Sequence, residues 1–182
     1  MATKSNKKAP SKQQAKDNML WLKILVPVLI VAVIAVIFIV KNIPEEQTPN
    51  VPDELFGLNA TTEIDFAELA EYGLPIIVDY GADSCIPCKQ MAPVLKTLNA
   101  EMKDKAFIKV VDVWKYGSAA NNVPIQLIPT QVFFNADGTP YMPSDSLKKE
   151  IGGFKFYNGF TIHEGGLTEQ EMRQILAEMG VE

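Results

Sequence analysis

Cysteine and histidine are the scarcest reactive residues in this 182-residue sequence, which contains two cysteines and one histidine. Cys85 and Cys88 are too close together for a disulfide that closes a structural loop, and too few for a four-ligand zinc site. The sequence also has no glycine-rich phosphate-binding loop and no internal repeat. We therefore expect neither a metal nor an organic cofactor, and we interpret the two cysteines as a local redox pair.

Positive charge is scarce in the C-terminal part of the chain. Ten Lys or Arg face 21 Asp or Glu after Lys41, whereas six lysines face a single acid up to Lys23. Nucleic-acid binding depends on Lys and Arg that displace counterions from phosphates. The acidic part of the chain is therefore not expected to have a nucleic-acid partner.

One long uncharged stretch, at 24–40, has the length that a membrane-spanning helix needs. Lysines precede it and Glu45 and Glu46 follow it, so the positive-inside rule places the N-terminus in the cytoplasm. A cleaved signal peptide fits less well because no small-residue cleavage site follows, and a buried soluble helix fits less well because there is no polar stripe. The sequence thus predicts a single-pass protein of the cell membrane with an extracytoplasmic domain.

These features divide the chain into four expected parts. They are a basic cytoplasmic tail at 1–18, a transmembrane signal-anchor at 19–41, a proline-containing linker at 42–54 and a folded domain at 55–182.

Hydrophobic periodicity within the folded domain predicts an α/β fold with a central mixed sheet flanked by helices. The expected elements are a helix at 62–72, a strand at 74–80, a helix at 89–102 interrupted by Pro93, strands at 106–113 and 130–134, and a helix opened by a capping box at Thr168. The segment 139–164 is expected to form an extended hairpin packed on itself or, alternatively, a partner-binding flap.

The cysteines precede the second predicted helix, where unpaired backbone N–H groups favour a thiolate. Cys85 is the expected nucleophile, and Cys88, one turn later, is the expected thiol that releases the product by closing an intramolecular disulfide. Asp79 lies in a predicted buried strand and is the expected proton acceptor for Cys88. The alternative interpretations are an inert cysteine pair, half of an intermolecular metal site, and a solvated Asp79.

Three segments, VDYGADSCIPCKQMAPVL, IPTQVFF and GGLTEQEM, resemble successive signature segments of the thioredoxin family. The resemblance covers about residues 60–180 and implies a thioredoxin-like fold and thiol–disulfide oxidoreductase activity. It implies that Asp79 is the family's buried acid. It also implies that Pro129 follows a cis peptide bond beside the cysteines, where the backbone of its neighbour Ile128 pairs with a substrate strand.

Some positions depart from the family pattern. Gly81 and Ser84 stand where thioredoxins have tryptophans, which suggests a narrower set of substrates, and Lys109 is out of register with the family's lysine beside the acid. Ile86 and Pro87 add no charge between the cysteines, which favours a reductase because an intervening histidine would make the disulfide more oxidising.

The sequence therefore predicts a membrane-tethered reductase of extracytoplasmic protein disulfides. Proteins similar to it draw electrons from transmembrane thiol reductants of the DsbD or CcdA kind, and the resemblance extends to preparing apocytochrome c cysteines for haem attachment. The alternatives are a disulfide-forming oxidase or isomerase, and a non-catalytic binding module that uses 139–164. No role is assigned to His163, Trp114 or Tyr116.

Overall fold

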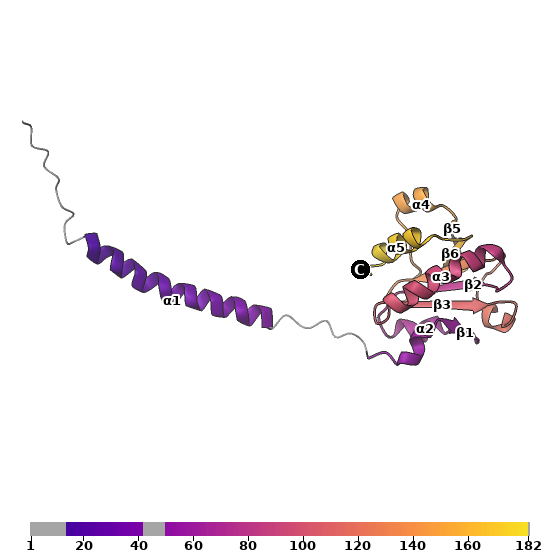
Figure 1. Cartoon of the computed structure of the whole chain (residues 1–182), viewed down its shortest axis with the longest axis horizontal. Coiled ribbons are helices and arrows are strands. Elements are labelled where there is room, and N and C mark those ends of the chain that lie inside the picture. Colours follow the sequence, from indigo (N-terminus) through magenta and orange to yellow (C-terminus); the bar gives the residue numbers. More distant parts are fainter. Residues whose placement is uncertain (1–13, 42–49, 182) are drawn as a thin grey trace, which may run out of the picture. The chain divides into compact units, whose positions relative to one another are not determined.

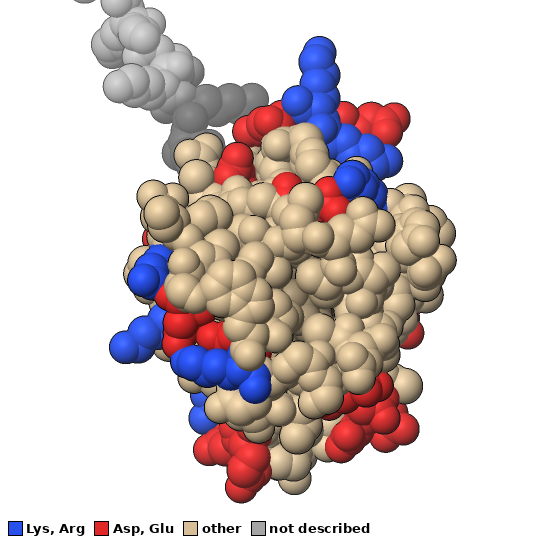
Figure 2. Space-filling view, turned by 90° about the vertical axis from the view of Figure 1, so that its right-hand side faces the viewer, with Lys and Arg blue, Asp and Glu red and all other residues tan. Residues whose placement is uncertain are grey.

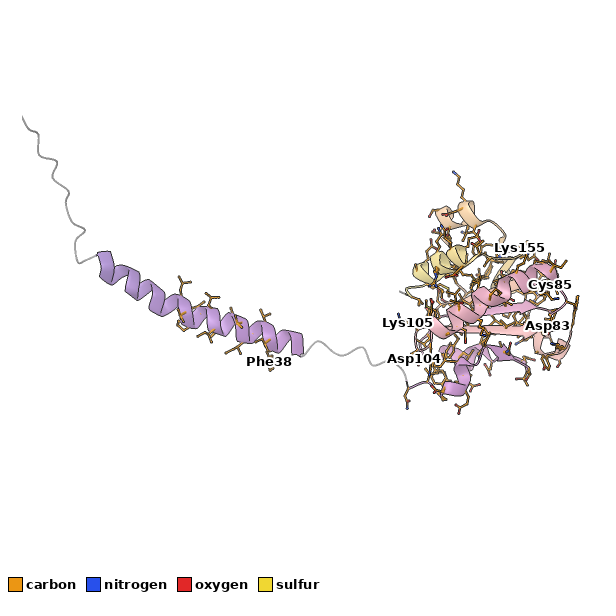
Figure 3. The ribbon with its side chains drawn as sticks, viewed as in Figure 1. Phe38, Asp83, Cys85, Asp104, Lys105 and Lys155 are labelled. Atoms are coloured by element: carbon orange, nitrogen blue, oxygen red, sulfur yellow. A yellow bond between two sulfur atoms is a disulfide. The ribbon has the colours of Figure 1, made fainter. Side chains whose placement is uncertain are left out.

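The computed structural model describes residues 14–41 and 50–181, which belong to two compact units, 1–47 and 48–182. Within the first unit, α1 (Gln14–Lys41) is a 28-residue helix, and its described side chains, at 25–38, are apolar and exposed; Phe38 is labelled in Figure 3. Among the side chains that the structure describes, no helix offers an apolar length sufficient to cross a bilayer. Residues 1–13 of the predicted tail and 42–49 of the predicted linker lie outside the described residues.

The second unit is built on a six-stranded mixed sheet, as the sequence predicts (Figure 1). The strand order is β1-β3-β2-β4-β6-β5, parallel among β1, β3 and β2 and antiparallel from β2 onward. The strands are β1 (Asn59–Ala60), β2 (Ile76–Gly81), β3 (Phe107–Asp112), β4 (Thr130–Phe134), β5 (Phe154–Tyr157) and β6 (Phe160–Glu164).

Helices cover both faces of this sheet, and β2 contributes to the core on each side. Its residues alternate between two clusters: Ile76 packs in the cluster that includes Leu69, while Ile77 packs in the cluster that includes Leu95 and Met172. The helices are α2 (Phe66–Ala70), α3 (Ile86–Glu101), α4 (Asp145–Ile151) and α5 (Glu169–Glu178). Because both faces are covered, all six residues of β2 are buried, which explains its nearly continuous apolar sequence.

Local capping explains where the observed helices differ from the predicted ones. The predicted helix at 62–72 begins only at Phe66, because the Asp65 side chain accepts hydrogen bonds from two backbone N–H groups of the first turn, each at 3.0 Å. The predicted helix at 89–102 begins earlier, at Ile86, and continues past Pro93. The capping box at Thr168 is present and opens α5 as predicted.

The segment 139–164 contains the predicted hairpin, formed by β5 and β6, but also a helix that the prediction missed. Ser144 caps this helix, α4, by accepting a hydrogen bond from the Leu147 backbone at 3.2 Å. Strand β1 was missed as well. It has only two residues, too few to produce a period-2 pattern in the sequence.

Candidate active site

Cys85 and Cys88 form a disulfide at the N-terminus of α3, the end of the domain where Figure 3 labels Cys85. Cys85 is the N-cap residue, and the Cys88 backbone N–H donates to its Sγ at 3.3 Å. Cys85 is half-buried, whereas Cys88 is 7% exposed. Cys85 is therefore the more accessible of the two cysteines.

Asp79 lies in β2 with 2% of its surface exposed. Burial raises the pKa of its carboxyl group to about 6, although a hydrogen bond from Gln131 Nε2 to Oδ1, at 2.7 Å, acts in the opposite direction. Its other oxygen, Oδ2, and Cys88 Sγ each lie 3.2 Å from the point that a β-carbon on Gly81 would occupy. A carboxyl group of this kind changes its protonation state near neutral pH, which suits exchange of a proton with Cys88.

A cavity of about 130 Å³ borders both Asp79 and Cys88. Its lining also includes Lys89 from α3, Val110 and Asp112 from β3, and Asp83 from the loop before α3. Val110 pairs with Asp79 across β2 and β3. Lys109, one position earlier, instead donates to the Gly57 carbonyl at 3.1 Å and does not supply a cation to this cavity.

The Ile128–Pro129 peptide bond is cis, as the sequence resemblance implies. The Ile128 carbonyl oxygen lies 3.9 Å from Cys85 Sγ. Two hydrogen bonds hold the loop in place, from Thr130 Oγ1 to the Leu127 carbonyl at 2.7 Å and from the Gly165 N–H to the Pro129 carbonyl at 2.9 Å. The structure thus brings the predicted residues Ile128 and Pro129 beside Cys85.

Asp112, which the sequence analysis did not single out, joins the cysteine loop to the turn after β3. Its Oδ2 accepts from the Asp83 N–H, and its Oδ1 accepts from the Trp114 and Lys115 N–H groups, each at 3.0 Å. Lys115 also forms an ion pair with Asp83. Partial burial by itself raises the pKa of Asp112, but these backbone donors outweigh it and hold the pKa below its ordinary value.

Apolar side chains lie exposed around this end of the domain. Ile86, between the cysteines, is 72% exposed, Trp114 is 65% exposed and Leu127 is 46% exposed. Figure 2 views this end and shows a broad central area without charged side chains, with acidic and basic residues around its rim. Such a surface suits contact with another protein more than contact with a small charged molecule.

Gln131 and His163 are two further buried polar residues that the sequence analysis left without a role. Gln131 Oε1 lies 2.8 Å from His163 Nδ1, so a polar chain runs from Asp79 through Gln131 to His163. The sequence offered one signal for Gln131, because it is a polar residue at a core-facing position of the apolar strand TQVFF. Among the residues that the structure describes, no three His, Cys, Asp or Glu side chains are grouped as metal ligands would be.

Comparison with known proteins identifies the family. The thioredoxin family model matches residues 59–151, about half of the chain. Thioredoxin Y1 of Arabidopsis chloroplasts is 41% identical over 66 residues, which cover 36% of this chain and 38% of that protein, less than two thirds of its length. The thioredoxin of Staphylococcus aureus is 40% identical over 96 residues, covering 50% of this chain and 90% of that protein.

Among solved structures, Fasciola hepatica thioredoxin aligns with a TM-score of 0.49 at 24% identity, over 68% of this chain and 99% of that one. The chain belongs to the thioredoxin family.

Proposed function

We propose that this protein is a membrane-tethered thiol–disulfide oxidoreductase that reduces disulfides in other proteins on the extracytoplasmic side. The observation that carries the redox chemistry is the Cys85–Cys88 disulfide at the start of α3, with the buried Asp79 carboxyl group bordering the same cavity as Cys88.

The proposed reaction begins from the reduced dithiol. The Cys85 thiolate attacks a substrate disulfide, forms a Cys85–substrate disulfide and releases one substrate thiolate. Cys88 then transfers its proton to the Asp79 carboxylate and attacks Cys85 Sγ. The Cys85–Cys88 disulfide forms, the second substrate thiolate leaves, and Asp79 returns the proton to solvent. Two electrons have then passed from the dithiol to the substrate.

The direction of transfer is inferred from the residues between the cysteines. Ile86 and Pro87 carry no charge that would stabilise the Cys85 thiolate further, and a less stabilised thiolate makes the dithiol a better reductant. The exposed side chains of Ile86, Trp114 and Leu127 support an apolar polypeptide as the docking partner.

The location rests on the sequence alone. The uncharged stretch at 24–40, with lysines before it and acids after it, supports a signal-anchor that leaves the folded domain outside the cytoplasm. Disulfides persist there, so a reductant needs electrons from across the membrane. A transmembrane thiol reductant of the DsbD or CcdA kind is the proposed donor, and apocytochrome c is a proposed substrate.

The reduction potential of the full-length protein tests the direction. Equilibration with dithiothreitol or glutathione buffers, with the Cys85–Cys88 disulfide as the readout, is expected to give a value near thioredoxin's, about −270 mV. A value between about −120 and −180 mV would instead identify a disulfide-forming oxidase or isomerase.

The location requires a separate test in intact cells. After mild reduction, a membrane-impermeant maleimide is expected to label Cys85 without lysis. Labelling that appears only after lysis would place the domain in the cytoplasm and contradict the proposed location.

A further inference from the structure

Asp79, Gln131 and His163 form one row of polar side chains across three neighbouring strands. Gln131 in β4 pairs with Asp79 in β2, and His163 in β6 pairs with Gln131. The exposed fractions of the three side chains are 2%, 0% and 4%. A buried polar row costs free energy unless its members bond to one another, so its presence at the reactive centre requires a physical reason.

The two ends of the row determine the orientation of the Gln131 amide. An ionised carboxylate can only accept hydrogen bonds, so the amide must direct Nε2 toward Asp79 Oδ1, at 2.7 Å. The other N–H of the amide reaches Met91 Sδ at 3.4 Å. Oε1 then faces His163 Nδ1 at 2.8 Å, and because a carbonyl oxygen can only accept, Nδ1 must carry a proton.

We propose that Gln131 and His163 are positioning residues for the proton acceptor: the Nδ1–H of His163 fixes the Gln131 amide, and the fixed amide keeps Asp79 available as a carboxylate when Cys88 must lose its proton. The inference rests on the dithiol mechanism proposed above and deepens it. Neither residue hydrogen-bonds to the sulfur of Cys85 or Cys88. Each acts through the carboxyl group of Asp79.

The hydrogen-bond chain matters because of what the amide could do without it. If His163 offered no donor, the Gln131 amide could turn and direct Oε1 toward Asp79. Two oxygens at hydrogen-bond distance require a proton between them, so Asp79 would then be held as the neutral acid. A neutral Asp79 cannot accept the proton of Cys88, and resolution of the mixed disulfide would require a higher pH.

The surroundings of His163 favour the neutral ring. Burial lowers its pKa, while Glu171 on α5, the backbone of Gly165 and Glu164 on β6 act in the opposite direction. Phe154 on β5 packs against the ring edge-on, with the ring centroids 5.3 Å apart. Around Asp79 itself, the charged or titratable groups are Cys88 and Lys89 on α3, Asp112 on β3, and Asp83 in the loop between β2 and α3.

The test compares His163→Leu with His163→Asn in the full-length protein. The two replacements have nearly the same shape, but only asparagine retains an N–H donor near the position of Nδ1. The reduced protein is mixed with excess 5,5′-dithiobis(2-nitrobenzoate). The first thionitrobenzoate released reports attack by Cys85, and the second reports resolution by Cys88. Both rates are measured against pH.

In His163→Leu, the pH midpoint of the second release is expected to rise by about one unit, the effect of losing a hydrogen bond to a charged group. His163→Asn is expected to retain the original midpoint, and the first release is expected to keep its rate in both variants. Gln131→Met removes the amide itself, and with it the hydrogen bonds to His163 and to Asp79. The pH midpoint of its second release should rise as in His163→Leu. Gln131→Met carries the test if His163→Leu does not fold.

Equal midpoints in the unaltered protein, His163→Leu and Gln131→Met would overturn the positioning role while leaving the dithiol mechanism intact. Equal shifts in His163→Leu and His163→Asn would also overturn it, because packing alone would then explain them. Absence of a second release in the unaltered protein would instead reject the proposed function.

Discussion

Asp79 Oδ2 and Cys88 Sγ both lie close to Gly81. Each lies 3.2 Å from the point that a β-carbon on Gly81 would occupy, so the two atoms are no more than 6.4 Å apart. Direct contact or a single bridging water can transfer a proton over such a distance. Glycine at residue 81 therefore places no side-chain atom beside the acid and the thiol.

Replacement of Asp79 by asparagine should slow the resolving step. The amide cannot take the proton of Cys88, and general-base assistance is typically worth about a hundredfold or more. Because burial raises the pKa of Asp79 to about 6, the unaltered rate should rise as pH increases through 6, and the variant should lose this rise. Stopped-flow release of the second thionitrobenzoate measures both effects. Loss of rate in the first release would show a broader disruption and contradict the assignment.

The same substitution should stabilise the fold at alkaline pH. The pKa of Asp79 is about 6 in the folded state and about 3.9 in an unfolded chain, so the folded state binds more protons between these values. Stability therefore falls as pH rises through this window and stays lower above it. A shift of two units corresponds to about 3 kcal/mol, so Asp79→Asn should raise the free energy of unfolding by up to that amount at pH 8 and very little at pH 4.

Urea unfolding at pH 4 and pH 8 measures this difference. Glu71→Gln, at an exposed position, is the control and should leave the free energy of unfolding unchanged at both pH values. A gain of the same size at pH 4 and pH 8 would show that titration of Asp79 is not its source.

A side chain at residue 81 should obstruct the path to the acid. A β-carbon there would lie 3.2 Å from Asp79 Oδ2 and from Cys88 Sγ, so Gly81→Val should displace one of them and lower the resolving rate. Gly117→Val is the matched control, because a β-carbon at that position meets no atom within 4 Å. Equal resolving rates in the two variants would show that the space at Gly81 is not required.

Trp114 should contribute to reactions with protein disulfides but not with small ones. It is 65% exposed. The backbone N–H groups of Trp114 and Asp83 both donate to the Asp112 carboxylate, which places Trp114 beside the cysteine loop. Trp114→Ala should lower kcat/KM for a protein disulfide about tenfold, as loss of an aromatic contact does at interfaces. The rate of reaction with 5,5′-dithiobis(2-nitrobenzoate) should not change. Phe156→Ala is the control, since Phe156 is 60% exposed on the edge strand β5. Equal losses in both variants would contradict a docking role.

The sequence predicts much of the fold because long apolar patterns determine the central strands. TQVFF became β4 with the predicted bounds, and the run around Ile77 became the buried strand β2. The elements that differ depend on single side chains. Asp65 shortens α2, and Ser144 starts α4 within a segment that was expected to form a hairpin or a partner-binding flap. The membrane anchor at 19–41 stays a prediction.

The candidate site was predictable where its residues are close in sequence. Cys85, Cys88 and Asp79 lie within ten positions, although the helix that carries the cysteines begins at Ile86 and not at the predicted residue 89. The roles of Gln131 and His163 were not predictable, because the hydrogen-bond chain from Asp79 through Gln131 to His163 depends on the register of three strands that are distant in the chain. The role of Asp112 likewise depends on a turn that brings Asp83 within hydrogen-bond distance.

Strand β2 pairs with β3 over six positions and with β4 over five. Backbone amides in a strand held on both sides exchange with solvent only when the whole domain unfolds, whereas the first turn of a helix opens readily. Asp79 is therefore expected to lie in the slowest-exchanging part of the domain, while Cys85 lies at a helix end. Oxidation and reduction can then rearrange the cysteine loop many times without moving the group that receives its proton.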